Sequence, residues 1–187
     1  MSHPFEQLNP KYEKKYFIFL IIMAIVIMAS MNIIGSPLTT SSAPYGIISF
    51  EFAFSPAHAQ EVINSWGMEA QLRAAFIQGL DFLFPLVYSA ALGLGCVLTA
   101  DVLRRRAKPF ARVGAPFAWG LVLAALCDYI ENIALTAILF GWVQSPFPEI
   151  AGICAVIKFT IILTAISYIL YGLVIRLISS SSNQSAT

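Results

Sequence analysis

The chain has 187 residues, of which 58% are hydrophobic and 11% are charged, whereas a soluble domain carries about 25% charged residues. This composition excludes an ordinary water-soluble domain and favours a chain folded in lipid. The formal net charge of +1 argues against nucleic acid as a partner, because nucleic-acid-binding proteins gather uncompensated Lys and Arg on one face.

Four apolar stretches are long enough to cross a bilayer, since a hydrocarbon core about 30 Å thick requires roughly 20 helical residues. They lie at about 16–34, 80–103, 117–142 and 150–175. We therefore predict an all-α fold, an antiparallel bundle of four transmembrane helices, with residues 1–187 in a single membrane domain. The first stretch is longer than the core of a signal peptide, so we expect it to remain as an uncleaved helix.

Basic residues lie before the first span, between the second and third, and after the fourth. They are Lys11, Lys14 and Lys15, then Arg104, Arg105, Arg106, Lys108 and Arg112, then Arg176. Because cytoplasmic loops near helix ends retain Lys and Arg, we expect a multi-pass protein of the cell membrane with both termini in the cytoplasm. The triple arginine alternatively suits anionic lipid headgroups.

The outer connection at 35–79 is too long for a simple turn. Within it Ile48, Phe50, Phe52 and Phe54 alternate with other residues, the period of a strand or extended segment. An isolated strand is marginal in water. We therefore expect this segment to lie on the bundle with its Phe side chains buried.

A short helix is predicted at about 56–66, with Ser55 as its cap, Pro56 in its first turn and Gly67 as its stop. Its apolar residues share one face, so we expect an amphipathic helix on the outer membrane surface, with Trp66 at the interface. From residue 68 to 103 only Gly79 and Pro85 interrupt the helical pattern, and this stretch should project outward or tilt.

The third span carries polar residues in its middle, in the run Cys127-Asp128-Tyr129-Ile130-Glu131-Asn132. Residues three and four apart share a helix face, so Asp128, Glu131 and Asn132 form one patch. A carboxylate at the centre of a bilayer costs about 2.5–3.5 kcal/mol by insertion scales. The patch must therefore face the bundle and find partners there.

Lys158 of the fourth span is the predicted partner. At about 1.5 Å per residue, Glu131 and Lys158 lie at nearly the same depth, roughly 15 Å from the outer helix ends. Tyr88 of the second span reaches the height of Asp128 and could donate a hydrogen bond to it. Asp81 and Glu51 are expected nearer the outer mouth of this cluster.

Two carboxyl groups against one ammonium leave a negative charge unbalanced. We therefore expect one carboxyl, Asp128 in preference, to hold a proton at neutral pH. Such a proton could serve acid-base catalysis or proton-coupled transport, or it could serve neutrality alone. A buried ion-pair network that fixes helix register is the structural alternative.

Metal and cofactor chemistry receive little support from the residues. Oxygen ligands on Asp128, Glu131 and Asp81 would suit a hard cation, but no His lies in any predicted span. The three cysteines form no CxxC pair and are predicted to be small packing residues. We predict no metal site and no cofactor.

Three stretches, EFAFSPAHAQEVINSW, GLDFLFPLVYS and CDYIEN, together resemble a group of small bacterial four-helix membrane proteins that carry no assigned function. The resemblance covers residues 51 to about 132. It implies the same architecture and a bacterial membrane, and it suggests Glu51, Asp81, Asp128, Glu131 and Asn132 as positions to test. It implies no activity.

Three functions are consistent with this sequence. The preferred one is a noncatalytic structural or partner-binding membrane protein, in contact with membrane lipid and either a second copy of itself or another membrane protein. The alternatives are a small proton-coupled transporter or binding protein, and an intramembrane enzyme acting on a lipid or another apolar substrate.

Overall fold

The computed structural model describes residues 2–184, and describes side chains as far as Ile178. Within these residues the chain is entirely helical and contains no strand. The helices are α1 (Glu13–Gly35), the short 3-10 helix η1 (Ser36–Leu38), α2 (Ile47–Glu51), α3 (Pro56–Ser65), α4 (Met68–Asp81), α5 (Phe84–Arg105), α6 (Gly114–Leu139) and α7 (Phe147–Gln184).

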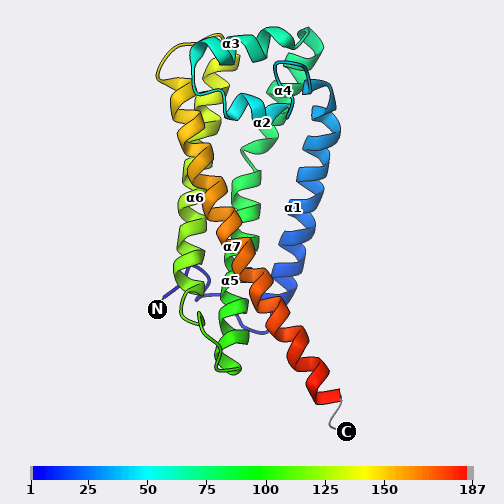
Figure 1. The fold of residues 1–187 in the computed structure, drawn as a ribbon, viewed down its shortest axis with the longest axis vertical. Helices are drawn as coiled ribbons and strands as arrows, with labels where there is room; N and C mark the ends of the chain where they lie inside the picture. Colours follow the sequence, from blue (N-terminus) through cyan, green and yellow to red (C-terminus); the bar gives the residue numbers. More distant parts are fainter. Residues whose placement is uncertain (1, 185–187) are drawn as a thin grey trace.

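Four helices are long and apolar enough to cross a membrane. The candidate spans are Glu13–Leu38, Phe84–Arg105, Gly114–Leu139 and Phe147–Ile178. The predicted fold class, an all-α membrane protein with four spanning helices and additional short helices, is confirmed. The fourth helix extends well past the predicted end at residue 175 and projects beyond the rest of the bundle (Figure 1).

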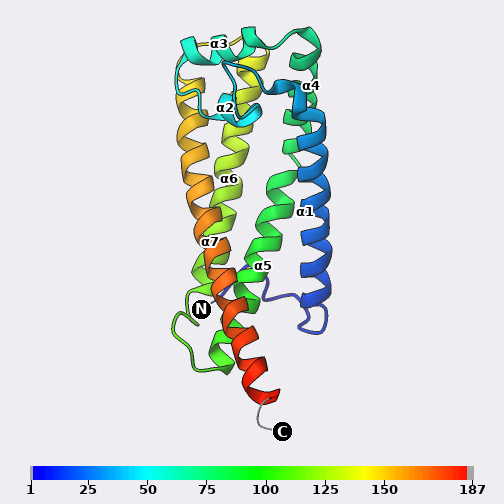
Figure 2. The ribbon, with the colours of Figure 1, turned by 45° about the vertical axis from the view of Figure 1, so that its right-hand side comes forward.

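Three of the long helices form the body of the bundle, and the first lies at its edge. α6 packs against both α5 and α7, whereas α1 packs mainly against α5 and α4 (Figure 2). Within the described residues Glu13–Gly35, only Ile27 is buried. Phe17 of α1 and Ile169 of α7 both lie against Gly95 of α5, where an added Cβ would lie 3.0 Å from Phe17 and 2.9 Å from Ile169.

Short helices cover one end of the bundle, which we call the capped end. α2 and α3 lie across it (Figure 1). Ser55 caps α3 as predicted, because its Oγ accepts a hydrogen bond from the backbone N of His58 at 3.3 Å. Trp66, which we expected at the membrane interface, is buried within the protein: its ring contacts Phe50, and its Nε1 donates to the Leu38 carbonyl at 2.8 Å.

The extended segment predicted from the alternation of residues 48–54 is wrong. Residues Ile47–Glu51 form helix α2, which satisfies backbone groups within the segment where a lone strand would leave them unpaired. Phe50 is buried as expected. Phe54 remains partly exposed, with its ring lying against Gly152 of α7.

The helical stretch predicted from residue 68 to 103 is interrupted at Phe82 and Leu83, between α4 and α5. Pro85 lies in the first turn of α5, where its missing N–H is tolerated, whereas inside a continuous helix it would remove a hydrogen bond. The break ends α4 at Asp81 and leaves this acidic residue buried against the bundle.

The segment before α1 packs against the opposite end of the bundle. The Phe5 ring lies over Gly93 of α5, where an added Cβ would lie 2.9 Å from it. Trp119 of α6 donates a hydrogen bond from Nε1 to the Ser2 carbonyl at 3.2 Å. These contacts join the start of the chain to α5 and α6.

Candidate functional site

Lys158 of α7 is the centre of a buried ionic cluster. Its side chain is only 6% exposed, and its Nζ lies 2.8 Å from Glu131 Oε1 and 3.0 Å from Asp128 Oδ1. Both acids come from α6, which packs along α7. The structure thus brings together the three residues whose depths were predicted to match, because the two helices are antiparallel neighbours with regular rise.

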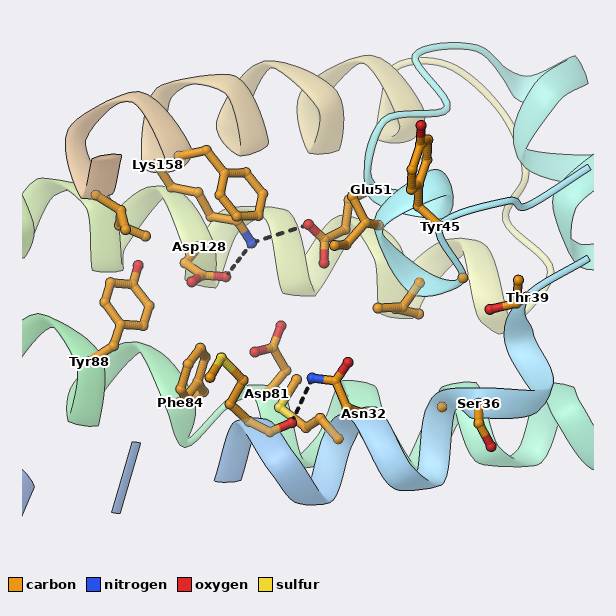
Figure 3. Close-up of a pocket in the computed structure, with 18 residues that line it drawn as sticks. Asn32, Ser36, Thr39, Tyr45, Glu51, Asp81, Phe84, Tyr88, Asp128 and Lys158 are labelled. Atoms are coloured by element: carbon orange, nitrogen blue, oxygen red, sulfur yellow. Dashed lines mark hydrogen bonds and ion pairs between the residues drawn. The ribbon is translucent and has the colours of Figure 1, made fainter. Parts of the chain in front are cut away.

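Glu51 of α2 completes the cluster from the capped end (Figure 3). Its Oε2 lies 3.6 Å from Lys158 Nζ. Sequence reasoning expected Glu51 at an outer mouth, and the helical form of α2 instead turns the carboxylate inward against Lys158. Burial raises the pKa of Glu51 above its ordinary value; Lys158 opposes this rise and Asp128 adds to it.

Asn132 faces the bundle but does not contact Lys158. Its Nδ2 donates to the Asp81 carbonyl at 3.2 Å, and its Oδ1 accepts from Gln78 Nε2 at 2.6 Å. Gln78 was not predicted as part of the site. Its position one turn after Ala74 and three residues before Asp81, both buried on α4, is the signal that could have identified it.

The Asp81 side chain points into the space between α1 and the ionic cluster (Figure 3). Burial raises its pKa to about 7 from an ordinary value of 3.8; repulsion from Asp128 adds to the rise, while Lys158 opposes it. Asp81 forms no salt bridge with Lys158. That lysine is paired with Glu51, Asp128 and Glu131.

Tyr88 of α5 is 5% exposed and its ring lies beside Phe84. Its hydroxyl points toward Asp128 (Figure 3). The hydrogen bond predicted between them is not formed: among the described residues Tyr88 Oη has no hydrogen-bond partner. The same holds for two buried carboxylate oxygens, Glu51 Oε2 and Glu131 Oε2.

A cavity of about 340 Å³ adjoins the cluster. Its polar lining includes the cluster residues Glu51, Asp128 and Lys158 and the neighbouring Asp81 and Tyr88, together with Asn32, Ser36, Thr39 and Tyr45 toward the capped end. Its apolar wall comes from two helices that face each other across it, through Met28 and Met31 of α1 and Phe159 and Ile162 of α7. The contribution of α1 was not predicted, because its cavity-lining residues within the predicted span are apolar except Asn32, which lies near the end of that span.

The site holds four carboxyl groups against one ammonium. Lys158 is the only basic residue among the described residues that line the cavity, and it is already engaged by three acids. Within residues 2–184 no group of three or more His, Cys, Asp or Glu side chains is arranged to hold a metal ion. The cavity lining therefore has more acidic than basic groups, and it includes two buried oxygens without a hydrogen-bond partner, Glu51 Oε2 and Tyr88 Oη.

No family model, no curated protein and no solved structure matches this chain. The four long apolar helices define its class, a small polytopic membrane protein. The salt-bridged Lys158 cluster is its most distinctive feature.

Proposed function

We propose that this protein is a noncatalytic membrane protein that binds a small ligand in the cavity, with the Lys158 cluster as the fixed wall of the site. The observation that supports this most directly is that two buried oxygens of residues lining the cavity, Tyr88 Oη and Glu51 Oε2, have no hydrogen-bond partner, although Glu51 Oε2 is ion-paired with Lys158 at 3.6 Å. A buried polar group without a partner costs about 1–3 kcal/mol. A ligand in the cavity would satisfy both.

The geometry of the cluster favours a fixed role over a catalytic one. A catalytic lysine needs a free amine, and Lys158 Nζ is held by Asp128 and Glu131 at hydrogen-bonding distance. Removing one member of such a buried set is strongly destabilising. Asp128 and Glu131 therefore tie α6 to α7 and give the cavity a rigid floor.

A proton-coupled binding protein or transporter is the second candidate, and Asp81 is the observation that favours it. This acid lines the cavity, and its pKa of about 7 allows it to gain and lose a proton near neutrality. Transport also requires access from the opposite end of the bundle. The close packing of Phe17 and Ile169 against Gly95 of α5 argues against such a path in this conformation.

For orientation, we propose that both termini lie in the cytoplasm, as the positive-inside rule indicates, and that the capped end faces outward. We also propose that the chain is related to the small bacterial four-helix membrane proteins that its sequence resembles. The lipid-facing surfaces of the long helices are the natural contacts for membrane lipid and for a second copy or another membrane protein.

Filling the cavity tests the binding function. Met31 lines the cavity, whereas Ile33, two residues away on α1, is 74% exposed. Wild-type protein, Met31→Trp and the control Ile33→Trp are purified in lipid nanodiscs and compared by native mass spectrometry. We expect a retained small molecule in wild type and in Ile33→Trp but not in Met31→Trp. The retained mass is the measured mass minus the mass calculated for each protein from its sequence. If this retained mass is the same for all three proteins, the proposal is contradicted.

A further inference from the structure

The cavity lies where two membrane-spanning helices diverge. α1 and α7 each place a side chain against Gly95 of α5, and toward the capped end the two helices lie farther apart, with α2 above the space between them (Figure 1). Side chains from both helices line the cavity between Gly95 and the capped end. One of them, Met28 of α1, is also 49% exposed at the surface of the protein. Met28 lies ten residues before the end of its span at Leu38, about 15 Å along the helix. Met28 therefore lies both on the cavity wall and on the outer surface of a candidate membrane span.

The polar end of the cavity is built to receive hydrogen-bond donors. Glu51 Oε2 can only accept when ionised, and Tyr88 Oη can accept one bond while donating another. Asp81 adds a second carboxyl group, which forms no salt bridge in the structure, whereas Glu51 is ion-paired with Lys158 at 3.6 Å. An ammonium group carries three donors and a positive charge, and so matches this set in number and in sign.

The other end of the cavity is suited to an apolar chain. Met28, Met31, Phe84, Phe159 and Ile162 line it. Thioethers adapt to chains of irregular shape, and an aromatic face attracts a nearby cation. Lys158 Nζ already lies 5.1 Å from the Phe159 ring. A volume of about 340 Å³ is at the small end of ligand pockets, large enough for a headgroup and the first part of its chain.

We propose that the ligand is a lipid-soluble organic cation, a protonated amine on an apolar chain, which enters from the membrane between α1 and α7. Its ammonium lies among Glu51, Asp81 and Tyr88, and its chain leaves the site along Met28 and Ile162. This inference rests on the proposed ligand-binding function. The chemistry is shared by free long-chain amines and by lipids with an ethanolamine headgroup.

Binding of tritiated dodecylamine to the full chain in phosphatidylcholine nanodiscs tests the ligand class. We expect saturable binding, displaced by unlabelled dodecylamine and not by dodecanol or dodecanoate, which carry the same chain without the positive charge. Glu51→Gln and Asp81→Asn should each weaken binding about tenfold or more, since each removes a charged hydrogen-bond acceptor. Replacing part of the phosphatidylcholine by phosphatidylethanolamine will lower dodecylamine binding if the lipid headgroup is the source, and leave it unchanged if a free amine is.

Asp101→Asn is the matched control, because Asp101 is an exposed acid at the opposite end that pairs with Arg104. It should bind dodecylamine like wild type. If dodecanol or dodecanoate displaces the labelled dodecylamine as well as unlabelled dodecylamine does, the ligand is not specifically an amine and this inference is overturned. The proposed ligand-binding function would still hold in that case if Met31→Trp abolished the binding of dodecylamine. If no probe binds and Met31→Trp retains the same mass as wild type, the binding function itself fails. The competition experiment uses wild-type protein alone, so it tests the amine class even if Glu51→Gln or Asp81→Asn fails to fold.

Discussion

Lys158 Nζ lies 2.8 Å from Glu131 Oε1, and Glu131 is completely shielded from the surface of the protein. The two side chains come from neighbouring helices that run antiparallel, and each is surrounded by further acids of the cluster. A contact of this kind is costly to form and more costly to break, because the partner left behind is a buried charge without compensation.

Replacing the lysine should therefore destabilise the bundle severely. We expect Lys158→Met to lower the free energy of unfolding by about 3–5 kcal/mol. Glu131→Gln added to Lys158→Met should recover only part of this loss, because Glu51 and Asp128 remain without their cation. Thermal unfolding in detergent measures both effects. Asp101→Asn, which breaks an exposed pair, should change stability by less than about 1 kcal/mol, and a Lys158→Met variant as stable as this control would contradict the prediction.

Asp81 should make stability depend on pH. Its pKa is raised in the folded protein from 3.8 to about 7, so the folded state binds the proton more tightly than the unfolded state does. The contribution of protonated Asp81 to the free energy of unfolding is therefore present at low pH and is lost as pH rises from about 4 to about 7. The groups that act on Asp81 are Asp128, Lys158, Glu51 and Asn132. Melting temperatures across this range should fall less steeply for Asp81→Asn than for wild type. Parallel curves would refute the assignment to Asp81.

The buried amide pair should hold α4 to α6. Asn132→Ala removes the acceptor of Gln78 Nε2 and the donor to the Asp81 carbonyl, so we expect a loss of about 1–3 kcal/mol in unfolding free energy. Asn64→Ala is the comparison, because Asn64 bonds to Gln60 on the exposed side of α3 and its loss should cost under about 0.5 kcal/mol. Chemical denaturation measures the unfolding midpoints of both variants. Equal midpoints for Asn132→Ala and Asn64→Ala would mean that the Gln78–Asn132 pair contributes nothing to stability.

Close packing of α5 on α6 should depend on Gly114. An added Cβ there would lie 2.6 Å from the Cys96 carbonyl oxygen and 2.6 Å from Ala100 Cβ, and backbone cannot move away cheaply. Gly114→Ala should cost about 1–3 kcal/mol. Gly120→Ala on the same helix meets only Ile161, at an ordinary 3.6 Å, and should be neutral or slightly stabilising. The melting temperatures of the two variants decide this, and a neutral Gly114→Ala would show that the helices can separate without penalty.

The spans and the central ion pair could be predicted because both follow from regular geometry. Apolar length identifies a spanning helix, and a fixed rise per residue places Lys158 level with Glu131. The capped end could not be predicted in the same way. Residues 48–54 alternate like a strand, yet the five residues of α2 are too few for a helical period to be visible in sequence.

The remaining errors concern contacts between distant segments. Glu51 reaches Lys158 only because α2 turns back onto the bundle, and Trp66 is buried only because Leu38 and Phe50 cover it. Gln78 gave a weak signal, a lone amide on the inner face of α4. Each of these placements depends on how the long connection folds over the helix ends, which residue spacing within any single segment does not determine.

The contacts of Phe5 with Gly93 and of Ser2 with Trp119 matter for handling the protein. A purification tag or fluorescent fusion placed ahead of Ser2 would lie next to these contacts and could disturb the packing of Phe5 on α5 and the hydrogen bond from Trp119 of α6. The far end of α7, which extends clear of the other helices (Figure 2), is the better point of attachment, and yields of protein tagged at the two ends should differ accordingly.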